Sequence, residues 1–378
     1  MRIHRLLLPR VVKTLTEVQK GVVIYGSRQV GKTTLANEVL AALGGKALVL
    51  SGDQRGGWWE LLTSRELSKI RLLLSGYEVL FVDEAQRIPE VGLALKIILD
   101  NFKDLRVLVT GSSSLDLASK ISEPLTGRVY TYKLWPISIE ELAQSKAPHE
   151  LEVELEERLV FGSYPRVFSI NSARDRAEYL SNLLDAYLYK DLLEFGDIRN
   201  SGKIRDLLKL LAFQVGSQVS MTELAGNLEL SRVTVDRYVD LLEKSFVVFR
   251  LGGFSRNLRK EVTKMDKIYF YDLGVRNALI GNLNVLNDRN DAGQLWENFL
   301  VVERIKKLTY AREVHSHYFW RLSSGAELDL VEERGGKLTG FEFKYSKKQP
   351  KVPTSWLETY PGSGFETVNK DNWQGFVR

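Results

Sequence analysis

Cysteine is absent from this chain of 378 residues. Its absence excludes disulfide bonds, thiolate-bound zinc and a cysteine nucleophile, and it fits a reducing compartment. The chain also lacks an apolar run long enough to cross a bilayer, and Leu6–Leu8 follows residues 1–5 without an extended secretory core. We therefore expect a cytoplasmic protein with no membrane partner, whose metal ligands would be oxygen or imidazole atoms.

A strong excess of either charge is also lacking. Lys and Arg number 53 and Asp and Glu number 48, which gives a net charge of +5. This mildly basic balance is compatible with a nucleic-acid partner but does not by itself indicate one. The chain is longer than the roughly 250 to 300 residues at which a single core stops growing, so we expect two to four domains. No internal repeat or low-complexity tract is present.

The most informative segment is residues 26–33, Gly-Ser-Arg-Gln-Val-Gly-Lys-Thr. It follows the apolar run Val22–Tyr25, which is typical of a buried strand, and it leads into a predicted helix. Strand, loop and helix in this order are the setting of a phosphate-binding loop, and a simple glycine-rich turn would not require them. Glycines let the backbone approach phosphates closely, and the helix N-terminus supplies N–H donors and partial positive charge.

The motif predicts a role for each of its residues. Lys32 would reach the β- and γ-phosphates as a catalytic residue, and the Thr33 hydroxyl would bind Mg²⁺. The complete set of expected nucleotide contacts in this segment is Gly26, Ser27, Arg28, Gln29, Val30, Gly31, Lys32, Thr33 and Thr34. The cofactors that we predict are ATP and Mg²⁺.

Two carboxylates follow a second apolar run. The run Val79–Val82 ends in Asp83 and Glu84, and the carboxyl ends of parallel strands are where α/β sheets bind ligands. Asp83 would orient Mg²⁺, and Glu84 would polarise the water that attacks the γ-phosphate. An acid pair after a strand could also form a solvated turn, but its position about fifty residues after a phosphate loop favours catalysis.

Two further positions remain open between a functional and a structural role. Thr110 or Ser112, after the strand-like run Arg106–Val109, could sense the γ-phosphate, or this segment could simply cap a helix at 115–118. Arg128, on a turn before a predicted strand, could stabilise transition-state charge from its own or a neighbouring subunit. The alternative is that Arg128 is an ordinary surface arginine.

Several segments of the chain together carry a resemblance to a known family. They are residues 26–34, 81–86, 110–113, 127–128, 135–138, 140–142, 161–165, 189–192 and 269–274. In this order they resemble the prokaryotic AAA-type ATPases that carry a C-terminal domain of unknown function related to restriction-endonuclease folds. Ser163 and Lys190 depart from the glycine and arginine expected there. The resemblance covers nearly the whole chain and implies ATP binding and hydrolysis, but it leaves the cellular task undefined.

We predict an α/β fold with four domains. Residues 1–145 would form a P-loop AAA-type ATPase domain with a parallel sheet, and residues 146–205 a helical lid or connector. Residues 206–280 would form a winged helix-turn-helix, and residues 281–378 a restriction-endonuclease-like α/β module of the PD-(D/E)XK type. The helical connector is predicted from apolar residues at helical spacing, including Leu180, Leu183 and Leu184.

The winged helix is predicted from two short helices expected at 221–228 and 231–242, followed by strands at 246–251 and 267–271. Ser231 would cap the second helix, and Val235, Tyr238, Val239 and Leu242 would form its buried stripe. Arg232 and Arg237 are offset by Asp236 and Asp240, so this helix has no cationic excess for DNA phosphates. In the predicted wing, by contrast, basic residues outnumber Glu261 and Asp266; they are Arg256, Arg259, Lys260, Lys264 and Lys267. Both DNA binding and protein interaction therefore remain open.

The last hundred residues contain a second group of side chains that could carry out chemistry. The alternating segments 326–331 and 339–344 predict a hairpin, which would bring Asp329 near Glu342 and Lys344. With Glu297 from a preceding helix, these carboxylates could hold a metal ion and activate water against a phosphodiester. The alternatives are a cross-strand salt bridge, or a nuclease-like fold that retains the ligands but serves as a platform.

The leading hypothesis is a Mg²⁺-dependent ATPase that moves DNA-binding or protein-binding C-terminal modules. A homo-oligomer is one assembly that this hypothesis allows. An ATP-gated, metal-dependent DNA nuclease is the alternative, and a nucleotide-dependent scaffold without turnover is a third possibility.

Overall fold

The computed structural model describes residues 3–111, 125–195, 201–256, 265–322, 324–347 and 349–378, with the backbone alone for residues 186–195 and 201. The described chain divides into two compact units. The N-terminal unit comprises residues 2–136 with 244–246, and the C-terminal unit comprises residues 137–243 and 247–378. The four-domain division is finer than these two units and stays a prediction.

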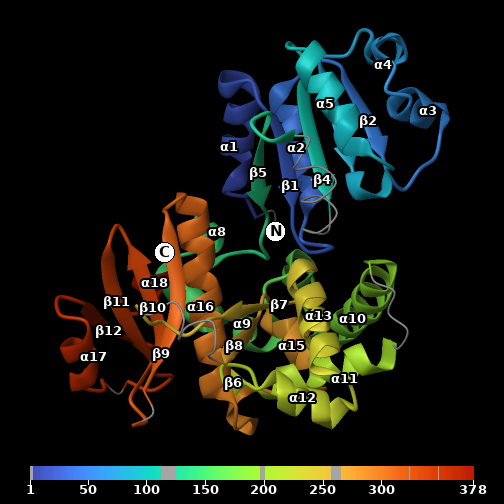
Figure 1. Ribbon diagram of the computed structural model, residues 1–378. Helices are drawn as coiled ribbons and strands as arrows, with labels where there is room; N and C mark the ends of the chain where they lie inside the picture. Colours follow the sequence, from blue (N-terminus) through green and yellow to red (C-terminus); the bar gives the residue numbers. More distant parts are fainter. Residues whose placement is uncertain (1–2, 112–124, 196–200, 257–264, 323, 348) are drawn as a thin grey trace. The chain divides into compact units, whose positions relative to one another are not determined.

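The N-terminal unit is built on a parallel sheet with strand order β2-β3-β4-β1-β5 (Figure 1). Its strands are β1 (Gly21–Tyr25), β2 (Ala47–Ser51), β3 (Val79–Asp83), β4 (Arg106–Gly111) and β5 (Val129–Lys133). Its helices are α1 (Leu7–Lys13), η1 (Thr14–Val18), α2 (Lys32–Leu43), α3 (Gly57–Thr63), α4 (Leu67–Leu74), η2 (Ala85–Arg87) and α5 (Val91–Asn101). The predicted parallel α/β sheet is confirmed.

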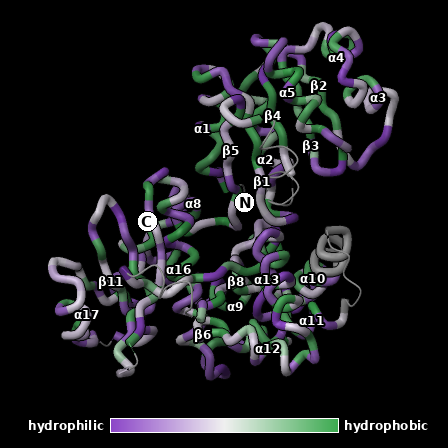
Figure 2. The backbone as a smooth tube through the Cα atoms, in the orientation of Figure 1, coloured by the Kyte–Doolittle hydropathy of each residue, from purple (hydrophilic) through white to green (hydrophobic). Residues whose placement is uncertain are grey.

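Both faces of this sheet are covered, which explains why its central strands are apolar runs without alternation. Val23, Leu80 and Val107 belong to a buried cluster with residues of α3, α4 and α5. Successive side chains point to opposite faces, so Val22 and Ile24, both fully buried, lie on the other face. The hydrophobic colour of β1 and β4 in Figure 2 follows from this double burial.

The first half of the C-terminal unit is mainly helical. Its helices are α8 (Ile139–Leu142), α9 (Pro148–Phe161), η4 (Pro165–Ser169), α10 (Ala173–Phe195), α11 (Ser201–Phe213), α12 (Met221–Leu228), α13 (Arg232–Lys244) and α15 (Leu273–Leu279). A small sheet of order β6-β8-β7 joins β6 (Gln218–Val219), β7 (Val248–Leu251) and β8 (Asp266–Phe270). The two short helices and two later strands expected here are present.

The predicted details of α13 also hold. The Thr234 backbone N–H donates to Ser231 Oγ at 3.1 Å, so Ser231 caps the helix as expected. The predicted stripe of apolar residues is buried, namely Val235, Tyr238, Val239 and Leu242. In helix α10, Leu180, Leu183 and Leu184 are likewise buried.

The second half of this unit is a four-stranded sheet of order β12-β11-β10-β9. Its strands are β9 (His315–Arg321), β10 (Glu327–Arg334), β11 (Lys337–Phe343) and β12 (Gly364–Val368), and its helices are η5 (Leu286–Asp288), α16 (Ala292–Ala311), α17 (Thr354–Thr359) and α18 (Trp373–Val377). Strands β10 and β11 form the predicted antiparallel hairpin, and β12 returns parallel to β11 after α17. Trp320 and Trp356 pack in its core.

Within the described ranges, none of the helices combines the length and the apolar character needed to cross a membrane.

Candidate functional site

The glycine-rich loop joins β1 to α2 in the manner that its sequence requires. A Cβ atom at Gly26 would lie 2.2 Å from the carbonyl oxygen of Leu134, so only glycine lets the loop pass this backbone. Gly31 precedes α2 with a φ of 99°, in the left-handed region that glycine tolerates. The loop therefore ends at the N-terminus of α2, where backbone N–H groups collect.

Lys32 lies at the start of α2 and is buried, with 5% of its surface exposed. Its Nζ donates hydrogen bonds to the carbonyl oxygens of Gly26 and Ser27, both at 3.0 Å. These contacts hold the ammonium against the glycine-rich loop. A cation in this position is suited to phosphate oxygens, which would replace neutral carbonyls by stronger, charge-assisted partners.

The predicted magnesium residues come together at the carboxyl edge of the sheet. Thr33 Oγ1 donates to Asp83 Oδ2 at 3.0 Å. Thr110, which is fully buried at the end of β4, donates its hydroxyl to the other oxygen of Asp83. Hydroxyl and carboxylate oxygens are the ligands that Mg²⁺ prefers, and it commonly retains water among them. Thr33 and Asp83 therefore fit a nucleotide-bound Mg²⁺.

Glu84 directly follows this carboxylate in an uncommon backbone conformation. Its φ of 48° lies in the left-handed region, which a non-glycine residue adopts at an energetic cost and often at functional sites. Its backbone N–H donates to Asp83 Oδ1 at 3.2 Å and to Thr110 Oγ1 at 3.3 Å. The side chain is held by Gln86, whose Nε2 donates to Glu84 Oε2 at 2.6 Å. The turn thus fixes the carboxylate next to the Thr33–Asp83 pair.

Arg5 and Gln86 support the site, but the sequence analysis did not single them out. Arg5, which is 7% exposed, donates from Nη1 to the Val30 carbonyl at 3.0 Å and from Nη2 to the Trp135 carbonyl at 2.5 Å. It therefore links Val30 in the glycine-rich loop to Trp135 in the segment after β5. Gln86 was visible in the motif at 81–86, whereas no sequence signal points to Arg5.

Arg128 lies at the opposite edge of the sheet. It directly precedes β5, which runs parallel to β1, so it lies at the amino ends of the strands, where the Arg128 carbonyl accepts from Gly21 N–H. Its guanidinium pairs with Asp100 through Nε at 2.7 Å and Nη2 at 3.1 Å, and it lowers the pKa of that carboxyl. A full strand length separates the two edges, so this position gives no support to a role for Arg128 at the phosphates of its own chain; a role at the site of a neighbouring subunit stays a prediction.

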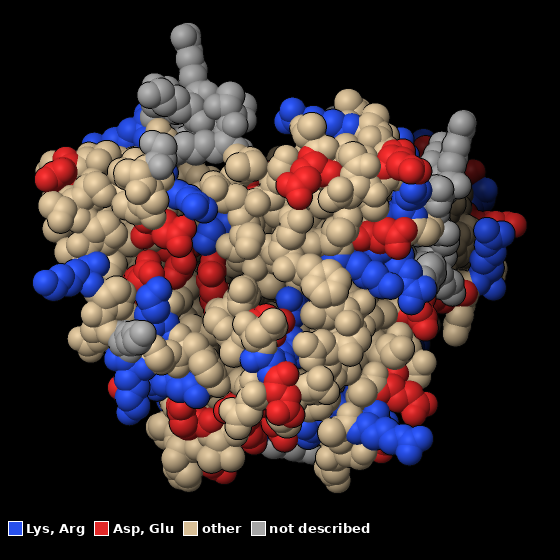
Figure 3. Space-filling model, turned by 90° about the horizontal axis from the view of Figure 1, so that it is seen from below, with Lys and Arg blue, Asp and Glu red and all other residues tan. Residues whose placement is uncertain are grey.

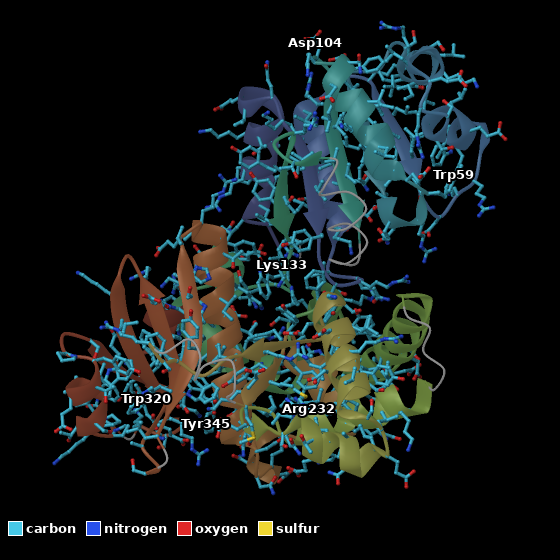
Figure 4. All side chains as sticks on the ribbon, in the orientation of Figure 1. Trp59, Asp104, Lys133, Arg232, Trp320 and Tyr345 are labelled. Carbon is cyan, nitrogen blue, oxygen red and sulfur yellow. The ribbon has the colours of Figure 1, made fainter. Side chains whose placement is uncertain are left out.

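An open cleft of about 700 Å³ marks this amino-terminal edge. Lys20, Asp100, Asp104, Arg106 and Arg128 contribute to its lining, and Asp104 is labelled at this end of the unit in Figure 4. Ser112 and the predicted helix at 115–118 lie outside the described residues, so Thr110 is the described hydroxyl at the strand tip.

The second predicted metal site is only partly assembled. The hairpin brings Asp329 to β11, where Asp329 Oδ2 accepts from Phe343 N–H at 2.7 Å, and Glu342 pairs with Lys344 at 2.6 Å. However, the described residues contain no group of three or more acidic or histidine side chains that could hold a metal ion. The geometry of the described residues therefore gives no support to the predicted metal site of Glu297, Asp329 and Glu342.

The physical reason is that a lysine lies among these carboxylates. Lys267 of β8 is 2.8 Å from Glu297 Oε1 and 3.8 Å from Asp329 Oδ1. Burial raises the pKa of Asp329 to about 7, with Glu297 adding to the rise and Lys267 opposing it. Lys267 is itself buried, which also corrects its prediction as a DNA-contacting residue of the wing. Four of the other predicted wing residues, Arg259, Lys260, Glu261 and Lys264, lie outside the described residues.

A parallel sheet with a glycine-rich loop between β1 and α2 and an acidic pair after β3 defines a P-loop nucleotide-binding protein of the AAA type. Family models agree: the AAA domain matches residues 18–143. Two domains of unknown function follow, DUF8612 over residues 152–285 and DUF4143 over residues 292–371. The chain belongs to the family of AAA-domain proteins that carry a C-terminal DUF4143 domain.

Similar proteins occur in bacteria and archaea. The uncharacterized protein Rv2008c of Mycobacterium tuberculosis is 32% identical over 85% of this chain and 70% of its own length. The uncharacterized protein MJ1637 of Methanocaldococcus jannaschii is 26% identical over 94% of this chain and 84% of its own length. The solved structure of the Walker-type ATPase paby2304 of Pyrococcus abyssi covers 74% of this chain and 96% of that protein, with a TM-score of 0.51 and 14% identity. At this identity the last likeness supports the fold alone.

Proposed function

We propose that the chain binds ATP with Mg²⁺ and hydrolyses it. The observation that carries this proposal is the hydrogen-bonded set of Thr33, Asp83 and Thr110 directly beside Glu84. When bound, Mg²⁺ neutralises phosphate charge and orients the triphosphate. The glycine-rich loop, from Gly26 to Thr34, would bind the phosphates through its backbone, with Lys32 as their cationic partner.

Two carboxylates with different surroundings would then have different roles, one in orienting the metal and one in activating water. Asp83 accepts two hydroxyl donors and a backbone N–H, which fix its carboxylate in a position suited to orient the metal. The Glu84 side chain accepts a hydrogen bond from Gln86, and we expect its carboxylate to act as the base that orients the attacking water. Thr110 supports Asp83 and the Glu84 backbone, which would couple this strand tip to the reacting phosphate.

The Lys32→Ala substitution tests this assignment. Loss of the ammonium should weaken ATP binding at least about tenfold, which is about 1.4 kcal/mol, and it should abolish measurable phosphate release. Isothermal titration with ATP and a phosphate-release assay on the full chain would measure both. Lys69→Ala is the matched control, because Lys69 is an exposed lysine of the same unit that pairs with Glu66. Unchanged binding and turnover in Lys32→Ala would reject the proposed site.

We further propose that nucleotide binding and hydrolysis move the C-terminal modules. The order α11, β6, α12, α13, β7, β8 and the sheet order β6-β8-β7 support a winged helix-turn-helix. The order α16, β9, β10, β11, α17, β12 supports the restriction-endonuclease-like module of the sequence analysis. The lysine among its carboxylates gives no support to nuclease chemistry.

The client of these modules would be DNA or a protein. Arg232 of α13, labelled in Figure 4, lies 3.7 Å from Asp236, and Arg250 pairs with Asp240 at 2.6 Å. Figure 3 shows positive and negative side chains interspersed over one face of the molecule. Paired charges of this kind contribute little to the binding of DNA phosphates. Measuring ATP hydrolysis with and without DNA, at a stated salt concentration, distinguishes a DNA client from a protein client. Stimulation by DNA would favour a nucleic-acid client, and no stimulation would favour a protein.

A further inference from the structure

The carboxylate cluster of the C-terminal unit is built around a lysine from another part of the chain. Lys267 of β8 contacts Glu297 of α16 at 2.8 Å and approaches Asp329 of β10 to 3.8 Å. The side chains are largely removed from solvent, with 7%, 15% and 12% exposure respectively. The ammonium is therefore enclosed between the two carboxylates that the sequence analysis assigned to a metal ion.

Strand β8 holds this lysine firmly in place. Tyr269 lies two residues further along the strand and thus on the same face as Lys267, and its hydroxyl donates to the same Glu297 oxygen at 2.6 Å. Asn298, the next residue of α16, accepts from Phe270 N–H at 2.8 Å and donates to the Phe270 carbonyl at 2.9 Å. Two successive residues of α16 therefore bind β8 and fix the strand that carries Lys267.

Two further carboxylate oxygens of the cluster are also engaged by the protein itself. Asp329 Oδ2 accepts from Phe343 N–H at 2.7 Å, and Glu342 Oε1 accepts from Lys344 Nζ at 2.6 Å. A hard divalent cation needs several oxygen ligands that converge at about 2.0 to 2.6 Å. Here the converging charge is an ammonium that is hydrogen-bonded to Glu297 at 2.8 Å and lies 3.8 Å from Asp329, and the donor set does not fit a resident metal.

We propose that the Lys267 ammonium permanently occupies the cation position of this nuclease-like cluster, so that Glu297 and Asp329 form a lysine-closed structural site rather than a metal centre. Lys267 and Tyr269 belong to the region matched by DUF8612, whereas Glu297 and Asp329 belong to the region matched by DUF4143. The same charge therefore closes the site and links these two parts of the C-terminal unit.

Manganese binding tests this proposal on the full chain. All proteins carry Asp83→Asn, which removes the metal ligand expected in the ATPase, and no nucleotide is added. Electron paramagnetic resonance measures bound Mn²⁺ as the added Mn²⁺ concentration is raised to about 1 mM. Weak oxygen-ligand sites bind divalent cations in this concentration range. With Lys267 present, we expect no Mn²⁺ whose binding depends on Asp329. Lys267→Ala should gain one Mn²⁺, and adding Asp329→Asn should remove it again.

Two lysine variants serve as controls. Lys267→Arg keeps a cation and should gain no Mn²⁺. Lys344→Ala removes the other lysine of the cluster but leaves Lys267 in place, so it should gain no Asp329-dependent site either. Mn²⁺ binding that requires Asp329 in the chain with Lys267 intact would overturn the proposal, and this arm decides the matter even if Lys267→Ala does not fold. A folded Lys267→Ala protein that gains no Mn²⁺ would overturn it equally.

Discussion

Arg5 shows how a single residue distant in sequence can support a nucleotide site. Its guanidinium bridges the carbonyls of Val30 and Trp135, which belong to the glycine-rich loop and to the segment after β5. Arginine suits this task because its planar fork presents donors in two directions at once, whereas lysine presents a single nitrogen. The glycine-rich loop is thereby fixed at Val30 before a nucleotide binds.

The Arg5→Met substitution should weaken ATP binding about tenfold, or about 1.4 kcal/mol, because the loop would have to be ordered at the moment of binding. Methionine retains the apolar stem but removes both donors. Isothermal titration with ATP measures the effect. Lys13→Met is the control from the neighbouring helix α1, where Lys13 is largely exposed and pairs with Glu17. Equal ATP affinity in Arg5→Met and the parent would contradict the assigned role.

At this scale the sequence predicted the residues that carry a local motif. The structure brings Thr33, Asp83, Glu84 and Thr110 together because each lies at the carboxyl end of a parallel strand or at the start of the helix that follows one. Arg5 could not be predicted, because its contacts cross 25 and 130 residues of sequence. Such pairing depends on tertiary packing, which leaves no periodic pattern.

Among the elements, strand β10 and helix α16 are joined by a buried ion pair. Arg304 donates to Glu332 from Nε at 2.7 Å and from Nη2 at 3.0 Å, and His317 of β9 lies 3.7 Å from the same carboxylate. Burial alone would raise the pKa of Glu332, but His317 and Arg304 outweigh it and lower the pKa to about 2. Folding therefore favours the ionised carboxylate.

This shift predicts a pH-dependent stability. The folded pKa is about 2 against an ordinary 4.5, so the stabilisation, on the order of 3 kcal/mol, is present above pH 4.5 and is lost as the pH falls towards 2. Glu332→Gln should therefore unfold at lower urea than the parent at pH 7, and the difference should narrow at pH 3. Tryptophan fluorescence follows the unfolding, because four of the seven tryptophans, Trp296, Trp320, Trp356 and Trp373, lie in the same part of the C-terminal unit as Glu332.

Glu333→Gln is the matched control, since Glu333 is the next residue of β10 and is exposed. It should change the urea midpoint little at either pH. A difference between Glu332→Gln and the parent that is the same at pH 7 and pH 3 would show that the carboxylate charge does not stabilise the fold.

The elements themselves were predictable where hydrophobic period and turn residues agreed. The apolar runs of β1 and β3 and the alternating hairpin of β10 and β11 all lie where the sequence predicted them. The failures concern the partners of these elements. Lys267 was assigned to an exposed wing because its neighbours are basic, but β8 is the middle strand of its sheet and packs its lysine against α16. Local charge does not reveal which face of a strand becomes buried.

For the whole molecule, the placement of Arg128 bears on assembly. Because it lies at the amino-terminal edge of its own sheet, a catalytic role would require that it enter the site of a neighbouring copy. This remains a prediction, and it makes the predicted homo-oligomer essential for turnover. An arginine supplied in this way is worth about 10³- to 10⁵-fold in phosphoryl-transfer rate.

Mixing two inactive variants tests this role. Arg128→Ala retains an intact phosphate site, and Lys32→Ala retains Arg128, so a mixed oligomer should release phosphate faster than the sum of the separate proteins. Arg106→Ala is the control, because Arg106 lies at the same edge and pairs with Glu78 at 3.2 Å; this variant should remain active alone. Full activity of Arg128→Ala alone would assign Arg128 a purely structural role with Asp100.

The central claim is that Glu84 activates water against ATP held by Lys32, Thr33 and Asp83. The most direct measurement is Mg²⁺-dependent phosphate release by the parent chain and by Glu84→Gln, at an ATP concentration that saturates both. We predict steady hydrolysis by the parent and a loss of about 10²- to 10⁴-fold in Glu84→Gln, with ATP binding retained. Equal turnover in the two proteins, or no turnover in the parent chain, would contradict the account.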